Sequence, residues 1–169
     1  MIAPTDFLGV NYYTRKIIRA ADIPEEENEP VAVMRGEPIT EMDWEVYPHG
    51  LYQTLGRLHF DYRIPEILIT ENGAAFPDTV DPDGEVRDPL RLEYIKRHLA
   101  AAYRAIEIGV PVKGYFVWSL FDNFEWGFGY RPRFGIVHVD FGTQKRTPKH
   151  SAIWYRNIIE QNGFIVKKN

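Results

Sequence analysis

Cysteine is absent from this sequence of 169 residues. Its absence excludes disulfide bonds, thiolate nucleophiles and zinc sites built on cysteine, and it agrees with a reducing compartment. The N-terminus also lacks a basic stretch followed by an apolar signal region, because Met1 to Asp6 lead directly into an apolar segment with the character of a strand. We therefore expect a cytoplasmic protein.

An excess of positive charge is also missing. Lys and Arg number 20 against 24 Asp and Glu, which gives a formal net charge of -4 and a pI near 5.7. This balance predicts no basic surface for nucleic acid, and no apolar run approaches the roughly 18 residues of a membrane span. The 5 histidines share no spacing typical of metal ligands. We expect no metal, no cofactor, no nucleic acid and no membrane partner, and we expect small neutral ligands.

What is present is typical of a globular domain. Hydrophobic residues make up 44% of the sequence and aromatic residues 14%, which is sufficient for one buried core. We interpret residues 1–169 as a single domain. Three apolar segments rich in β-branched or aromatic residues predict buried strands at residues 7–13, 67–70 and 115–120.

Helical patterns separate these segments. Leu51, Leu55 and Leu58 recur at intervals of four and three residues, which predicts one face of a helix. A second helix is predicted from a cap at Asp88 to Gly109, and its apolar stripe is Leu92, Ile95, Leu99, Ala102 and Ile106. A third is predicted between residues 147 and 163. The alternation of strands and helices predicts an α/β fold with a parallel sheet and crossover helices.

Polar and aromatic residues follow the end of each predicted strand. In α/β sheets, ligands bind at the carboxyl ends of parallel strands. Carboxylates and amides bind sugar hydroxyls, and indole rings stack on the apolar faces of sugars. The sequence therefore favours a sugar site built from these residues: Asn11, Tyr13, Glu71, Asn72, Trp118, Glu125 and Trp126.

Glu71 comes directly after the apolar run of residues 67–70. A carboxylate in such a place costs free energy unless it is paired or used in chemistry. Two interpretations remain open from the spacing alone. Glu71 either caps the next turn or binds a neighbouring loop, which is the commoner case, or it is a catalytic nucleophile. Retaining glycoside hydrolysis needs two carboxyl groups about 5–5.5 Å apart, and the sequence offers one convincing candidate.

Three blocks of sequence carry a resemblance to a known family. Thr70-Glu71-Asn72-Gly73 resembles the nucleophile motif of the family 1 glycoside hydrolases, the β-glucosidase family, and Asn11-Tyr12-Tyr13-Thr14 resembles a segment that precedes it there. Residues 117–126, continuing to 133–136, are similar to the sugar-binding strand and loop of that family. The resemblance covers essentially the whole chain. It implies the C-terminal part of a TIM (β/α)8 barrel, about three of its eight βα units.

The resemblance also implies roles for single residues. Glu71 would be the nucleophile, and Tyr13 would donate a hydrogen bond that orients its carboxylate. The remaining site residues would contact the substrate: Asn11 in the same pocket, Glu125 and Trp126 on sugar hydroxyls, Trp118 as the stacking floor, Phe134 as a wall, and Trp44 beside the aglycone. Taken alone, Trp118 would more often be a core residue, Glu125 a solvated acid and Tyr13 a residue of the barrel rim. Asp122 and Asn123 are interpreted as turn formers.

The sequence departs from the family in length. Three strands are present where a complete barrel needs eight and about 250 residues. The acid/base glutamate of the family, in an Asn-Glu-Pro motif, would lie upstream of everything present. An Asn28-Glu29-Pro30 tripeptide does occur, but it lies in an acidic, proline-containing loop with no apolar strand before it. We therefore expect Glu29 in a solvated loop and not in a catalytic role.

Two classes of function remain. The first is part of a retaining enzyme that hydrolyses terminal β-D-glucosides or related β-glycosides once the missing N-terminal half is supplied. The second is a noncatalytic fragment that serves as a sugar-binding or assembly module. In both cases the open slice of a barrel exposes sheet edges and apolar faces. We expect it to bind the N-terminal part of the same barrel as a separate chain, or to self-associate. A nucleotide-binding domain is excluded because no glycine-rich phosphate loop follows a strand.

Overall fold

The computed structural model describes residues 5–17 and 38–165. Strands and helices alternate along the chain, as the sequence predicts. The elements are β1 (Leu8–Asn11), α1 (Pro48–Phe60), β2 (Ile67–Asn72), α2 (Pro89–Glu107), β3 (Val112–Val117), the 3-10 helix η2 (Trp126–Phe128), β4 (Val137–Val139), β5 (Arg146–Pro148) and α3 (His150–Gln161). The Asn28-Glu29-Pro30 tripeptide lies outside the described residues.

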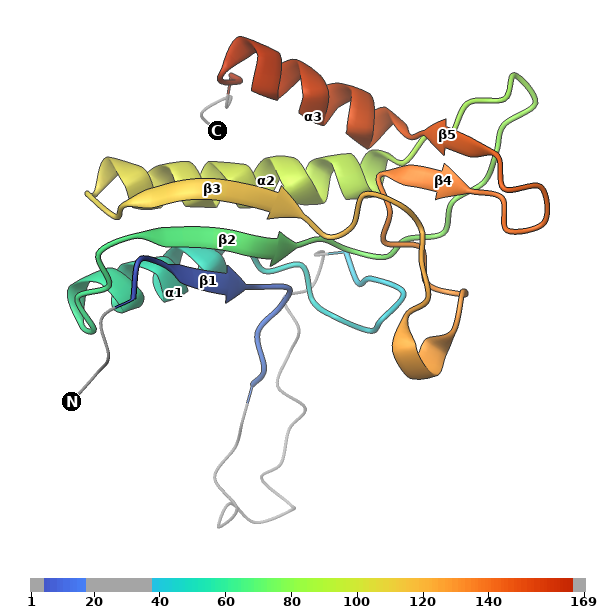
Figure 1. Ribbon diagram of the computed structural model, residues 1–169. Helices are drawn as coiled ribbons and strands as arrows, with labels where there is room; N and C mark the ends of the chain where they lie inside the picture. The colour runs from blue at the N-terminus through green and yellow to red at the C-terminus, as the bar shows by residue number, and fades with distance from the viewer. Residues whose placement is uncertain (1–4, 18–37, 166–169) are drawn as a thin grey trace, which may run out of the picture.

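The main sheet has 3 strands in the order β1-β2-β3, and both pairings are parallel. In Figure 1, α1 and α2 lie on the same face of this sheet and α3 lies beyond α2. The carboxyl ends of the strands point to the same side of the molecule, where the long connections after β2 and β3 gather. A second, antiparallel ribbon of β4 and β5 stands at this end. The predicted parallel α/β arrangement is confirmed.

The core lies between the sheet and the helices. Leu51 and Leu55 of α1 and Ile67 and Ile69 of β2 are all fully buried in one cluster, as the spacing of the leucines predicts. On the opposite face of the sheet, Phe116 of β3 is 56% exposed among the described residues. Apolar side chains on this face are therefore available for further packing.

The strand boundaries differ from the prediction in β2 and β3. β2 extends to Asn72, so Glu71 lies within the strand and not after it. β3 is Val112–Val117, about three residues earlier than predicted. β3 ends early because Trp118 N still donates to Asn72 O, whereas Ser119 N donates to Phe134 O, farther along the chain. The chain therefore leaves the sheet at this point to pair with a segment that returns from the next loop.

The helix α2 ends as predicted and buries most, but not all, of the predicted face. Ile95 and Ala102 are buried, whereas Ile106 is 46% exposed, so the predicted stripe is wrong at its C-terminal end. Polar side chains, among them Arg91 and His98, are fully buried on α2 instead. α2 lies between the sheet and α3, and it buries side chains toward both layers.

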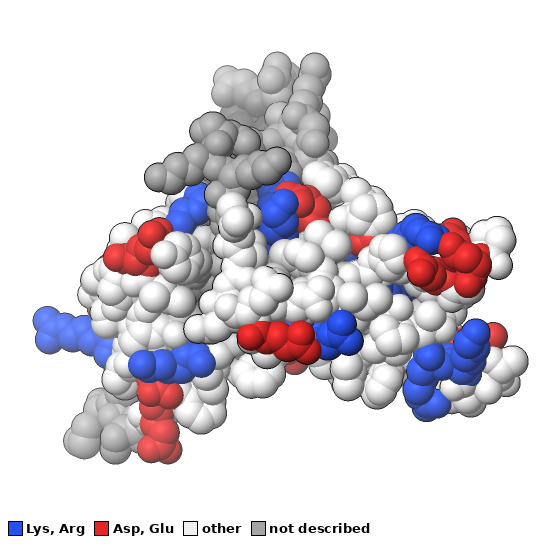
Figure 2. Space-filling model, turned by 90° about the horizontal axis from the view of Figure 1, so that it is seen from above, with Lys and Arg blue, Asp and Glu red and all other residues white. Residues whose placement is uncertain are grey.

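The surface carries no large field of one sign on the face seen in Figure 2. Acidic and basic side chains lie next to one another in small groups around the rim of this face. Arg87 forms ion pairs with Asp81, Asp83 and Glu85. Among residues 5–17 and 38–165, every helix is too short or too polar to span a membrane.

Candidate active site

The carboxyl ends of the three parallel strands bring the predicted site residues together. Asn11 of β1 pairs with Glu71 of β2, and Asn72 pairs with Val117 of β3. Tyr13 follows β1 by two residues, and Trp118 comes directly after β3. Parallel pairing thus places side chains from three distant parts of the sequence at one edge of the sheet.

Tyr13 and Glu71 form a short hydrogen bond. Tyr13 Oη donates to Glu71 Oε2 at 2.6 Å. Burial raises the pKa of the Tyr13 phenol far above its usual value, and the bond to Glu71 raises it further. The phenol therefore stays protonated and acts as a permanent donor to the carboxylate. This pair is the one that the resemblance predicts.

Aromatic rings enclose the pair from one side. The Tyr13 ring lies 5.4 Å from that of Trp44 and 6.2 Å from that of Phe134, and the last two are 6.1 Å apart, all between centroids. Phe134 is only 2% exposed. It forms a wall behind Tyr13, which fixes the direction in which the phenol points.

Glu125 lies within electrostatic reach of Glu71 and is hydrogen-bonded to the side chain of Trp118. Burial raises the pKa of Glu125, the side chain of Trp118 lowers it through a hydrogen bond, and the charge of Glu71 raises it again. The indole therefore orients the Glu125 carboxylate, and two carboxyl groups share one side of the site. Such a pair with a neighbouring indole can bind several hydroxyls of one sugar.

The last two predicted residues are more open. Asn11 is exposed, and its Oδ1 accepts a hydrogen bond from Thr70 Oγ1 at 2.7 Å. Trp126 is 81% exposed, the most exposed aromatic residue of the predicted site. No group of three or more His, Asp or Glu in the described ranges is arranged to hold a metal ion.

Asn72 has a larger structural role than its sequence position indicates. Its side chain is fully buried, and Nδ2 donates to Tyr12 O at 2.6 Å and to Tyr94 Oη at 3.1 Å. Its Oδ1 accepts a hydrogen bond from Tyr115 Oη. The sequence predicts Asn72 at the strand end, but it gives no sign that Tyr94 and Tyr115 support the site. Tyrosines in helices and strands are usually core residues.

Asp122 does more than form a turn. Its side chain is fully buried and pairs with Lys149 and with Arg133, at 2.9 Å and 2.6 Å. It also accepts hydrogen bonds from the main-chain N–H groups of Gly135 and Val139. Burial acts to raise the pKa of Asp122, but the Lys149 charge and the hydrogen bonds outweigh burial and lower it. The carboxylate therefore closes the base of the loop that carries Glu125.

The ion pair of Asp122 with Lys149 belongs to a buried network behind the site. Arg91 of α2 binds Asp78 at 2.9 Å and Asp88 at 2.7 Å, and both partners are fully buried. Lys149 also binds Asp78, and Arg91 donates to Arg133 O at 2.6 Å. The network joins α2, the connection after β2, the loop after β3 and the start of α3. It holds the two connections that carry the site against the same helix.

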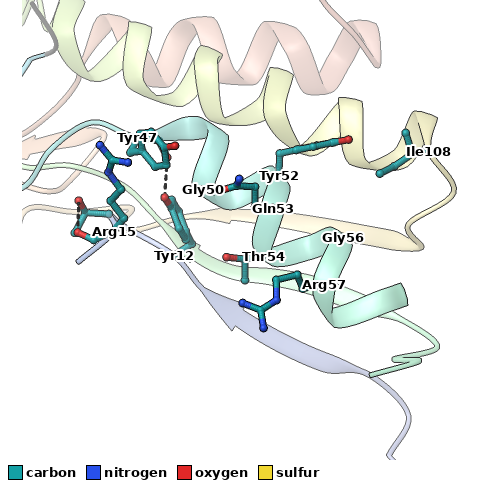
Figure 3. Close-up of a pocket in the computed structure, with 11 residues that line it drawn as sticks. Tyr12, Arg15, Tyr47, Gly50, Tyr52, Gln53, Thr54, Gly56, Arg57 and Ile108 are labelled. Carbon is teal, nitrogen blue, oxygen red and sulfur yellow. Dashed lines mark hydrogen bonds between the residues drawn. The ribbon is translucent and has the colours of Figure 1, made fainter. Parts of the chain in front are cut away.

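One hollow of the described residues lies away from Glu71. It has a volume of about 700 Å³ and lies between the end of β1 and α1 (Figure 3). Tyr12 donates to Tyr47 O inside it, and the Arg15 guanidinium lies 3.8 Å from the centre of the Tyr47 ring. None of the predicted catalytic side chains lines it, so it is not the candidate active site.

Parallel βα units with carboxylates, amides and aromatic rings at their carboxyl ends are typical of part of a (β/α)8-barrel enzyme. Comparison with known proteins identifies the enzyme family. The family model for glycosyl hydrolase family 1 matches residues 1–164. The chain belongs to glycosyl hydrolase family 1, as the three sequence blocks predict.

Its relatives are complete enzymes of this family. The chain is 49% identical to β-glucosidase A of Thermotoga maritima, over 94% of this chain and 35% of the relative. It is 44% identical to β-glucosidase A of Acetivibrio thermocellus, over 95% and 36%. A solved family 1 β-glucosidase of Thermotoga maritima, in complex with isofagomine lactam, matches at a TM-score of 0.85 and 49% identity, over 94% of this chain and 35% of that one.

The chain thus spans about a third of the length of the relatives it matches. It corresponds to their C-terminal portion, which confirms the prediction of a partial barrel. The strands that would complete the barrel are not part of this sequence.

Proposed function

We propose that this chain is the nucleophile-bearing part of a retaining β-glycosidase that acts on terminal β-D-glucosyl residues. The observation that carries the proposal is the 2.6 Å hydrogen bond from Tyr13 to Glu71 at the carboxyl edge of the parallel sheet. A carboxylate that accepts a hydrogen bond from a partly buried phenol that stays protonated is held in a fixed direction, as a nucleophile must be.

The proposed reaction has two steps. Glu71 attacks the anomeric carbon and forms a covalent glycosyl-enzyme, while an acid protonates the departing oxygen. Water, activated by the same group acting as base, then releases the sugar and frees Glu71. We expect this acid/base carboxyl from the N-terminal part of the barrel. Glu125, Trp118 and Trp126 would bind the sugar, Asn11 and Phe134 would line its pocket, and Trp44 would face the aglycone.

The sugar is proposed to be a neutral glucoside. One relative, 48% identical over 94% of this chain, is a 1,4-β-D-glucan glucohydrolase of Thermotoga neapolitana, so β-1,4-linked glucose oligomers from cellulose are candidate substrates. Another, 43% identical, is a 6-phospho-β-galactosidase of Streptococcus equi subsp. zooepidemicus. The Glu125 carboxylate beside Glu71 disfavours a phosphorylated sugar, because like charges in a partly buried site repel.

The partner is proposed to be the N-terminal part of the same barrel. Phe116, 56% exposed, lies on the uncovered face, and β1 and β3 leave one free edge each. Open edges and apolar faces of this kind associate with complementary strands. We call the assembly of this chain with an N-terminal part, such as that of a family relative, the completed barrel.

A substitution of the nucleophile tests the proposal against a noncatalytic binding or assembly role. Glu71→Gln in the completed barrel should reduce hydrolysis of an aryl β-glucoside by at least about 1,000-fold, since covalent catalysis is lost. Glu93→Gln, on the exposed face of α2, is the matched control and should leave the rate unchanged.

Binding of glucose by calorimetry separates the two roles further. If the Glu71→Gln barrel hydrolyses the glucoside as fast as the parent, the enzymatic role is wrong. If neither hydrolyses it but both bind glucose, the noncatalytic role is the correct one.

A further inference from the structure

The main-chain segments that carry Tyr13 and Glu71 lie at the very end of the sheet. Tyr12 N donates to Glu71 O at 2.9 Å, which is the last backbone bond that joins the two segments. Tyr13 lies beyond this bond, and β1 itself ends at Asn11. A further contact must therefore hold the main chain of Tyr13 if its phenol is to meet Glu71 at 2.6 Å.

Tyr94 supplies this contact from α2. Its hydroxyl donates to Tyr13 O at 2.9 Å and accepts from Asn72 Nδ2 at 3.1 Å. The side chain is 1% exposed. One buried hydroxyl thus joins Tyr13, the second residue after β1, to Asn72, which follows Glu71 in β2.

Asn72 completes the connection between the strands. Its Nδ2 also donates to Tyr12 O at 2.6 Å, and its Oδ1 accepts from Tyr115 of β3. Asn72 therefore binds main chain on one side of Glu71 and a side chain of the third strand on the other. Because Asn72 follows Glu71 directly in the chain, the hydrogen bonds of Asn72 also fix the main-chain position from which the Glu71 side chain extends.

The two phenols keep this arrangement over a wide pH range. Burial raises the pKa of Tyr94 above its usual value, with the charge of Tyr12 acting in the same direction. Burial also raises the pKa of Tyr115. Both remain protonated donors wherever the protein is folded.

We infer that Tyr94 and Asn72 are positioning residues that set the separation between the Tyr13 hydroxyl and the Glu71 carboxylate. This inference rests on the proposed function, since it gives the separation its catalytic meaning. Neither residue faces the sugar, and both act through Tyr13 and Glu71. A loss of either contact lets the main chain of Tyr13 move relative to β2, and the nucleophile loses its fixed direction.

The first test is structural and needs no turnover. Crystal structures of the completed barrel are determined for the parent, Tyr94→Phe and Tyr155→Phe. The control is matched, because Tyr155 is also a largely buried phenol that donates to a main-chain oxygen, Tyr115 O, at 2.8 Å. In Tyr94→Phe the Tyr13–Glu71 hydrogen bond should be broken or lengthened beyond 3.5 Å, and in Tyr155→Phe it should be kept. A kept bond in Tyr94→Phe overturns the inference.

The second test is a double-mutant cycle on kcat with Tyr13→Phe. Tyr94→Phe should lower kcat about tenfold in the parent and leave KM nearly unchanged, the size expected for one buried hydrogen bond that acts on the transition state. In the Tyr13→Phe background, most of this loss should disappear, because the group that Tyr94 positions is gone. Equal losses in both backgrounds would show a merely structural role and overturn the inference.

Two further outcomes concern a variant that does not fold and a parent barrel without activity. If Tyr94→Phe does not fold, Tyr115→Phe replaces it, since it removes the bond to Asn72 Oδ1 and should show the same loss and the same dependence on Tyr13. If the parent barrel keeps the Tyr13–Glu71 bond but hydrolyses no glycoside, the proposed function has failed, and the catalytic role of Tyr94 and Asn72 fails with it. If instead the parent is active and the effects of Tyr94→Phe and Tyr13→Phe are additive, only the inference on Tyr94 and Asn72 fails.

Discussion

At the scale of single residues, the Tyr13 hydroxyl determines how the candidate nucleophile is held. The bond to Glu71 is short and involves a charged acceptor, and such bonds contribute about 1.5–3 kcal/mol. In the completed barrel, Tyr13→Phe should therefore lower kcat for an aryl β-glucoside by about 10–100-fold. Tyr62→Phe, at a position that is 62% exposed, should have no effect. An unchanged kcat in Tyr13→Phe would mean that the bond plays no part in catalysis.

Asp122 gives the fold a dependence on pH. Lys149 and Arg133 hold its pKa below the ordinary value of 3.8, so its ionised form stabilises the folded state. This stabilisation is complete above about pH 4 and is lost as the pH falls through the lower, folded pKa. Asp122→Asn leaves Arg133 without its carboxylate and the buried Lys149 with Asp78 alone, and it should cost about 3–5 kcal/mol at neutral pH.

Urea unfolding of the completed barrel at pH 7 and pH 3 measures this effect. The gap in the free energy of unfolding between the parent and Asp122→Asn should shrink at the lower pH. Asp83→Asn, at an exposed carboxylate paired with Arg87, should change little at either pH. A gap that is equally large at both pH values would contradict the assignment.

At the scale of elements, the sequence predicted the pattern better than the boundaries. The strong period of Leu51 and Leu55 and the proline and glycine that bound α2 located the helices, because these signals are local. The end of β3 at Val117 could not be predicted, since it depends on Ser119 pairing with Phe134, far along the chain. The same holds for Arg91, whose partners Asp78 and Arg133 come from the connection after β2 and from the loop after β3.

The close approach of β2 and β3 is a further property of elements. A Cβ at Gly73 would lie 1.8 Å from Trp118 O, so Gly73→Ala must push the two strand ends apart. We expect it to lower the free energy of unfolding by more than about 3 kcal/mol and to abolish activity. Gly56→Ala, in α1 with no atom within 4 Å of the added Cβ, should stabilise by about 0.5–1 kcal/mol. Thermal unfolding of both variants tests the pair, and a Gly73→Ala protein as stable as its parent would contradict the geometry.

At the scale of the whole molecule, the site residues could be predicted as a set from the sequence blocks. Glu71, Tyr13 and Trp118 come together because parallel strands end at one edge, which the alternation of elements predicts. The contacts that hold them could not be predicted, since Tyr94 and Asp122 look like ordinary core and turn residues in the sequence. Which residues lie opposite Glu71 depends on strands outside this sequence.

The uncovered face of the sheet predicts how the chain assembles. A charge at Phe116, which is 56% exposed on that face, should prevent burial against the N-terminal part of the barrel. Phe116→Glu should therefore abolish the one-to-one complex seen by native mass spectrometry. Tyr103→Glu, equally 56% exposed but on α2, should leave the complex intact. A complex that survives Phe116→Glu would show that another surface binds the partner.

The central claim is that Glu71 is the nucleophile of a retaining β-glycosidase, and covalent trapping tests it most directly. The completed barrel is incubated with an activated 2-deoxy-2-fluoro-β-glucoside, digested, and the peptides are analysed by mass spectrometry. The account predicts one fluoroglucosyl group per barrel on the peptide that contains Glu71, and none in Glu71→Gln. No adduct, or an adduct on another carboxylate, would contradict it.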